Sequence, residues 1–285
     1  MTAFYHFDEP RLPPELEEKV FIQAIDHNFS DVPNIILVAK RVHHWYHPDL
    51  SIPRPCNCAY NNHFRLMPHI FNIVLLHEDP PFPMKFSLPT FQRYGKHVQH
   101  LSLDGPVVKH LALFTNITNL VLWDEYEPSE LEILLTFNHL THLSITIHNE
   151  PNAIHFSLFS KVTHLDLVSG CIDWSLAHAL IKFPLLTHLS ILRAIDKDVL
   201  KLFLDRNRCR NLKVVILWRP TRTPKKTCVP EEARDHLPVE DERLINVLCQ
   251  DVMEDWKNGA RGEDDMWRVA DRYLAWAHSR GLTEV

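Results

Sequence analysis

A six-residue pattern, apolar-x-x-apolar-x-apolar, recurs along much of this chain. Its clearest copies are LTHLSI at Leu140–Ile145 and at Leu186–Ile191, with VTHLDL at Val162–Leu167 between them. Counted at the middle apolar residue, seven copies follow one another at intervals of 28, 19, 23, 22, 24 and 26 residues, at Ile73, Leu101, Leu120, Leu143, Leu165, Leu189 and Val215. Recurrence near one period predicts a row of similar structural units.

Each copy is predicted to form a short strand. Its last two apolar positions alternate with polar ones, which is the period of a strand with one buried face. A single such strand cannot bury its apolar face alone, but stacked copies form a continuous core. The segments between copies change to helical spacing. We expect Ser129 to cap a helix that buries Leu131, Leu134 and Leu135, Asp173 to cap one that buries Leu176, Ala179 and Leu180, and Asp196 to cap a third.

Units of strand, turn and helix, 19–28 residues long, resemble the leucine-rich repeat. The resemblance covers Ile70 to Trp218 in an irregular form, and it implies an α/β solenoid with parallel strands and with helices on the convex side. In that family, the residue before the first buried strand position points to the concave face. The resemblance therefore implies a column of polar residues there, at His100, Asn119, His142, His164 and His188.

The same geometry places Ile216, Trp123 and Trp218 on the concave face, and the latter two occupy equivalent positions. With the polar column, these residues form the predicted partner-binding face. Two interpretations of the histidines stay open: a solvated ladder without chemistry, or a binding surface. The column offers no carboxylate or thiolate that would complete a metal site. The apolar residues Leu192, Val214, Ile216 and Trp218 either bind a partner or are covered by the C-terminal segment.

The N-terminal segment contains two predicted helices. The first follows the proline pair Pro13–Pro14 and carries acidic residues at its start. The second runs through IILVAKRV and has one apolar face. Both resemble the F-box over residues 11–50: Leu12, Pro13, Glu15 and Leu16 match the opening of that pattern, Val20 and Phe21 its bulky pair, and Leu37, Val38, Ala39, Lys40, Arg41 and Trp45 its close.

The combination is similar to F-box-like leucine-rich-repeat proteins of mushroom-forming fungi. It implies contact with a Skp-type adaptor through Leu12, Pro13, Leu16, Val20, Phe21, Leu37 and Val38. The alternative is an N-terminal helical cap that shields the first repeat. The tail resembles that family too, in Asp255, Trp256, Gly262, Asp265 and Trp267. The expected domains are 1–55 (F-box-like), 56–97 (proline-rich, with the first repeat strand), 98–250 (repeats, ending in a strand at RLINVLC) and 251–285 (helical cap).

Composition limits the function classes. A net charge of −6 argues against nucleic-acid or acidic-membrane binding. Phosphate-binding glycine motifs, a G-x-S-x-G elbow and an H-E-x-x-H pair do not occur. His43 and His47 share a helix face, but Cys56 and Cys58 lack zinc-knuckle spacing, so we expect no metal and no cofactor. We find no membrane span or signal peptide pattern, and six irregularly placed cysteines indicate the cytosol or nucleus.

These observations predict a non-enzymatic protein-interaction module, namely the substrate-recognition subunit of a Skp-cullin-F-box ubiquitin ligase. The partners would be the adaptor and a protein substrate whose identity the sequence does not give. The alternative is a repeat scaffold that does not bind an adaptor. A third class, a histidine-based hydrolase or metalloenzyme, would need a nucleophile–base pair or a closed ligand set.

Overall fold

The computed structural model describes residues 20, 72–76, 88–104, 111–124, 126, 128–146, 160–168, 172–192, 195–220, 237–249 and 251–281. The chain divides into two compact units, Met1–Asn72 and Ile73–Val285. In the first unit the structure describes only Val20, which is helical and about half exposed, and Asn72. The account below concerns the second unit.

The second unit is built on one open, parallel sheet. Its eight strands follow one another in the sheet in the order of the sequence, which is compatible with a solenoid. The strands are β1 (Ile73–Leu76), β2 (His100–Leu103), β3 (Asn119–Leu122), β4 (His142–Ile145), β5 (His164–Leu167), β6 (His188–Ile191), β7 (Val214–Pro220) and β8 (Leu244–Cys249). The expected eighth strand, in RLINVLC, is thus present.

The strand register confirms the sequence alignment from β2 to β7. Leu101 pairs with Leu120, and the pairing continues through Leu143, Leu165, Leu189 and Val215. The alignment of β1 was wrong by one residue, because Val74 and not Ile73 pairs with Leu101. All four residues of β1 are apolar, so alternation gives no signal for its register.

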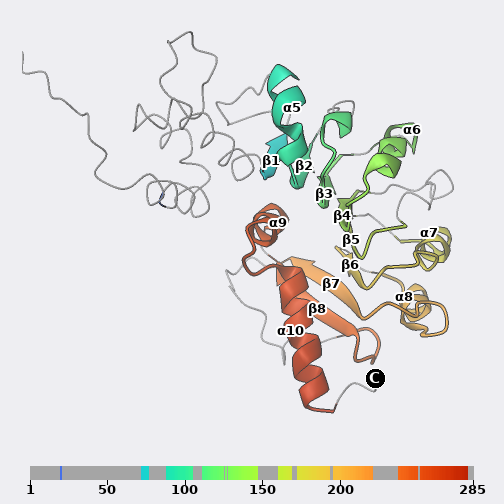
Figure 1. Ribbon diagram of the computed structural model, residues 1–285. Coiled ribbons are helices and arrows are strands. Elements are labelled where there is room, and N and C mark those ends of the chain that lie inside the picture. Colours follow the sequence, from blue (N-terminus) through green and yellow to red (C-terminus); the bar gives the residue numbers. More distant parts are fainter. Residues whose placement is uncertain are drawn as a thin grey trace, which may run out of the picture. The chain divides into compact units, whose positions relative to one another are not determined.

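Short helices cover one face of the sheet, called here the outer face (Figure 1). They are α5 (Leu88–Tyr94), α6 (Pro128–Leu131), α7 (Trp174–Leu180) and α8 (Lys197–Leu204), with 3-10 turns at Gly95–His97 and Glu132–Thr136. The main core lies between these helices and the outer face. There the row from Leu101 to Val215 is at most 1% exposed.

Two of the three predicted helix caps are confirmed. The backbone N–H of Leu176 donates to Asp173 Oδ1 at 2.8 Å, and Asp196 Oδ1 accepts from Asp198 and Val199. The third expectation was wrong. Ser129 lies inside α6, and Leu135 is 53% exposed because the chain tightens into a 3-10 turn after Leu131 and rotates that side chain away from the sheet.

Candidate functional site

Two C-terminal helices lie on the opposite face of the sheet, called here the inner face (Figure 1). They are α9 (Val252–Ala260) and α10 (Met266–Ser279). Asp251 caps α9 by accepting from Glu254 N–H at 3.1 Å, and Asp265 caps α10 by accepting from Arg268 N–H at 2.9 Å. The described residues 251–281 thus hold two helices joined by a turn at 261–265, and both helices lie on the inner face.

The apolar side of α10 packs on the last strands. Met266, Ala270, Tyr273 and Ala277 form one buried cluster with the inner-face residues Val214, Ile216, Trp218, Ile245 and Val247. Leu192, Trp267 and Leu274 pack at its margin. Of the two interpretations of this apolar patch, cover by the C-terminal segment is the one observed. The expectation that Ile216 and Trp218 form an open binding face was wrong, because α10 buries them to 0% and 4% exposure.

The predicted polar column is present on the inner face. His100, Asn119, His142, His164 and His188 pair in register from strand to strand. The rings of His142 and His164 stack with centroids 4.0 Å apart, and those of His164 and His188 at 4.2 Å. The expected open face is closed at the β6 end of the column, whereas the members from His100 to His164 are partly exposed. Trp267 of α10 packs edge-on against His164 and His188, and His188 is only 5% exposed.

The threonine before each histidine of β4, β5 and β6 bonds to the imidazole that follows it. Thr141, Thr163 and Thr187 each donate the hydroxyl proton to a backbone carbonyl of the preceding repeat, at 3.0–3.2 Å. Each hydroxyl oxygen also lies 2.8–3.0 Å from Nδ1 of the histidine that follows. A hydroxyl has one proton, so at His142 and His164 it accepts from Nδ1–H, and Nε2 of the neutral ring is left as an acceptor. At His188, Nε2 lies 3.2 Å from the Asp271 carboxylate, and that bond requires a proton on Nε2 instead. The repeated Thr-His pair is thus a structural unit.

Burial keeps these histidines neutral. It lowers the pKa of His100 and His142 to about 4, and neighbouring histidines add to the effect in His142. The pKa of His164 falls to about 2 for the same reasons. For His188, burial lowers the pKa although Asp271 of α10, 3.2 Å from Nε2, opposes the shift. Neutral stacked rings are suited to packing and do not provide a row of cations.

The next inner-face column is buried more completely. Ser102, Val121, Ser144, Asp166, Ser190 and Ile216 are all at most 8% exposed. The equivalent tryptophans make the same bond: Trp123 Nε1 donates to Ser102 Oγ at 2.8 Å, and Trp218 Nε1 donates to Ser190 Oγ. In both cases the indole reaches the serine of the preceding strand.

Asp166 is the one carboxylic acid of this column. Ser144 Oγ donates to its Oδ2 at 2.8 Å, and the nearby Ser190 hydroxyl also favours the ionised form. Its other oxygen, Oδ1, is buried and has no hydrogen-bond partner among the described residues. Burial raises the pKa of Asp166 to about 6, although the two serine hydroxyls lower it. An unpartnered oxygen on a buried acid is costly, and it indicates a polar group that can occupy the adjoining space.

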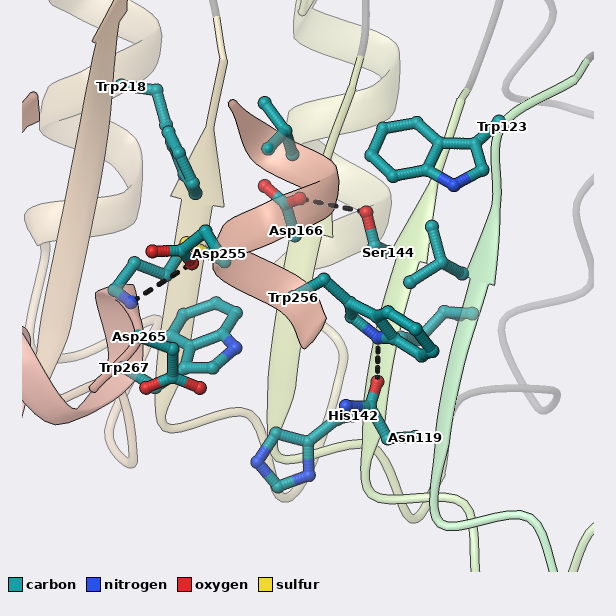
Figure 2. A pocket seen from close by; sticks show the side chains of 14 residues that line it. Asn119, Trp123, His142, Ser144, Asp166, Trp218, Asp255, Trp256, Asp265 and Trp267 are labelled. Atoms are coloured by element: carbon teal, nitrogen blue, oxygen red, sulfur yellow. Dashed lines mark hydrogen bonds between the residues drawn. The ribbon is translucent and has the colours of Figure 1, made fainter. Parts of the chain in front are cut away.

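That space is a small cavity of about 30 Å³ between the inner face and the two C-terminal helices. Figure 2 shows Asp166 and Ser144 on one side of it and residues of α9 and α10 on the other. Four tryptophans line the cavity, namely Trp123, Trp218, Trp256 and Trp267, together with three aspartates, Asp166, Asp255 and Asp265. Trp256 Nε1 donates to Asn119 Oδ1 at 2.9 Å, which ties α9 to β3.

The two helix aspartates are held by backbone groups. Asp255 Oδ2 accepts from Met266 N–H at 3.1 Å, so it connects α9 to the start of α10. Burial, with Asp265 and Asp166 adding to it, raises the pKa of Asp255 to about 7. Burial also raises the pKa of Asp265, against the effect of its backbone bonds and of Arg268. Gly259 makes room for Asp265, because a methyl group at that position would collide with the carboxyl group.

This cavity contains residues that the sequence indicated for different reasons. Asn119, Trp123, His142 and Trp218 belong to the predicted partner-binding face, and Asp255, Trp256, Asp265 and Trp267 to the tail whose role the sequence left open. His100, His164, His188 and Ile216 do not line it. Asp166 was not singled out. The sequence feature that could have identified Asp166 is its charged side chain in a column otherwise made of serine and apolar residues.

Several predicted residues lie outside the described part of the chain. They include six of the seven expected adaptor contacts, Leu12, Pro13, Leu16, Phe21, Leu37 and Val38, and the possible half-site of His43, His47, Cys56 and Cys58. Within the described residues, no group of three histidine, cysteine or acidic side chains could hold a metal ion. No helix described here combines the length and the apolar character needed to cross a bilayer. Comparisons with protein-family models and with curated proteins gave no match.

Proposed function

We propose that this protein is a non-enzymatic interaction module of the F-box-like leucine-rich-repeat type. In this role, residues 11–50 bind a Skp-type adaptor, and the repeats hold a protein substrate for a cullin ubiquitin ligase. The main observation in support of the proposal is a row of in-register repeats that follows an F-box-like pattern in the sequence. A sequential parallel sheet with a polar column on one face is suited to recognition, because each repeat adds side chains to one surface.

The C-terminal helices restrict where a substrate can bind. They occupy the inner face from β3, through Trp256, to β7 and β8, through the α10 cluster. A partner of that face must therefore bind beside α9 and α10 or displace them. A scaffold without adaptor binding remains the second candidate, since it needs only the repeats.

Adaptor binding separates the two candidates. The purified full chain is mixed with a Skp-type adaptor at micromolar concentration and analysed by size-exclusion chromatography. We expect a complex that Leu16→Asp plus Val20→Asp abolishes, because both residues lie on the predicted apolar stripe of the first helix. Glu17→Asp plus Lys19→Asp changes the same segment off that stripe and should retain the complex.

The double variants should leave the repeats folded, which circular dichroism and tryptophan fluorescence can check, since Ile73–Val285 is a separate compact unit. If the unmodified chain forms no complex, the ligase assignment fails and the scaffold candidate replaces it.

A further inference from the structure

We propose that the cavity between the inner face and the C-terminal helices is a binding site for a primary alkylammonium group. The ammonium would take the place next to Asp166 Oδ1, with Asp255 and Asp265 as further negative partners and the tryptophans as aromatic walls.

Asp166 provides the first argument. Its side chain lines the cavity, its exposure is 3%, and Oδ1 lacks a hydrogen-bond partner in the part of the chain that the structure describes. Ser144 already donates to Oδ2, and Oδ1 has the capacity to accept from a further donor. A bound N–H group would satisfy it, and a cationic donor would form the stronger bond.

The charge balance of the lining provides the second argument. Among the residues that the structure describes, three carboxyl groups line the cavity, and no lysine or arginine does. Arg268 acts on Asp265, but it is exposed and lies outside the lining. His142, which does line the cavity, is neutral at pH 7 because burial lowers its pKa to about 4. Burial raises the pKa of Asp166 and of Asp255, and no cation of the described lining opposes this effect.

The aromatic lining and the size define the class of cation. Tryptophan faces attract organic cations more strongly than other side chains do. A volume of about 30 Å³ accommodates one or two water molecules, or an ammonium group of similar size. The fit thus favours a primary ammonium at the end of an alkyl chain over a bulky quaternary one. A lysine side chain of a partner protein and the end of a polyamine share this chemistry.

The test is titration of the full chain with n-butylammonium, followed by calorimetry and tryptophan fluorescence. We expect saturable binding in the millimolar range, with a fluorescence change from the cavity tryptophans. n-Butanol, which lacks the charge, and tetramethylammonium, which lacks N–H donors, should not bind. Affinity should rise between about pH 5 and about pH 8, because the cation binds best when Asp166 and Asp255 are ionised.

Asp166→Asn keeps the shape and removes the charge, and it should weaken butylammonium binding about tenfold or more. Glu263→Gln removes one charge from the exposed turn before α10 and should leave binding unchanged. If butylammonium does not saturate, or if both variants weaken it equally, the cavity holds water only and the proposal is wrong. If butylammonium does bind, titration with spermidine and with a lysine-containing tripeptide distinguishes a polyamine from a lysine side chain as the natural source of the ammonium group. The source whose probe binds more tightly is the one favoured. The proposal does not rest on adaptor binding, and the outcome is independent of that experiment.

Discussion

Asp166 shows how one residue can set the electrostatics of a whole face. It stands in a column of serine and apolar side chains, where α9 and α10 exclude solvent. Two serines stabilise the ionised form, but burial outweighs them and raises the pKa to about 6. At neutral pH the protein therefore keeps a carboxylate in a place that favours the protonated acid.

A pH-dependent effect follows for Asp166→Asn. Because its folded-state pKa exceeds the ordinary 3.8, protonated Asp166 stabilises the fold fully below pH 3.8, and this stabilisation is lost as pH rises through about 6. Asparagine cannot titrate. The free energy of unfolding of the variant, relative to the original chain, should therefore increase by about 2 kcal/mol between about pH 4 and about pH 8.

Urea unfolding at these two pH values, followed by tryptophan fluorescence, measures this difference. Glu240→Gln is the control, since it makes the same chemical change at an exposed position. A relative stability of Asp166→Asn that does not change with pH would show that the carboxyl group is hydrated in the fold.

At the residue level, the sequence predicted well which face of the sheet each residue lies on, and it predicted poorly how exposed that residue is to solvent. Alternation with period 2 identified which residues share a face, so the column from His100 to His188 was predicted in full. Whether that face is open depends on Trp267 and Asp271, which lie far along the chain and contact it only after folding. Local patterns contain no information on such contacts.

At the scale of an element, the C-terminal helix α10 shows which features of a helix the sequence predicts and which it does not. Its start was predictable from Asp265, and its buried side from the spacing of Met266, Ala270, Tyr273 and Ala277. The place on the sheet where α10 packs was harder to predict from the sequence. The pattern predicts an apolar patch around Trp218 and a helix with an apolar side, and the cover of one by the other was one of two open alternatives.

Two substitutions of alanine by glutamate on this helix test its docking. Ala270 is 0% exposed and packs in the cluster with the strands, whereas Ala275 is exposed on the same helix. Ala270→Glu would place a charge in an apolar, filled space, so we expect a loss of about 3 kcal/mol or more in the free energy of unfolding. Ala275→Glu should change it by about 0.5 kcal/mol at most.

Urea unfolding gives both values, and limited proteolysis reports where the change occurs. We expect cleavage within residues 252–281 to become faster in Ala270→Glu alone. Equal losses in the two variants would mean that α10 is not docked in the register described here.

At the scale of the whole unit, the C-terminal helices link strands that are far apart in the sequence. Contacts in a stacked array are mainly between neighbouring repeats, so such an array can open from one end. Here α9 contacts the early strands, through Trp256 to Asn119 and Met253 to Ser102, while α10 contacts β7 and β8. The helices therefore connect both parts of the sheet.

The final prediction concerns this connection. Trp256→Ala removes the bond to Asn119 and the largest side chain that α9 places on the early strands, so β2 and β3 should open more often than β6 and β7. In native-state hydrogen exchange, the amides of β2 and β3 should exchange about tenfold faster or more, whereas the exchange of β6 and β7 should change little.

Trp276→Ala is the matched control, because Trp276 packs with Tyr273 against the cluster of the last strands. In this variant, faster exchange should appear at β7 and β8. If both variants accelerate exchange equally throughout the sheet, the sheet opens as one unit, and α9 and α10 do not stabilise its two parts separately.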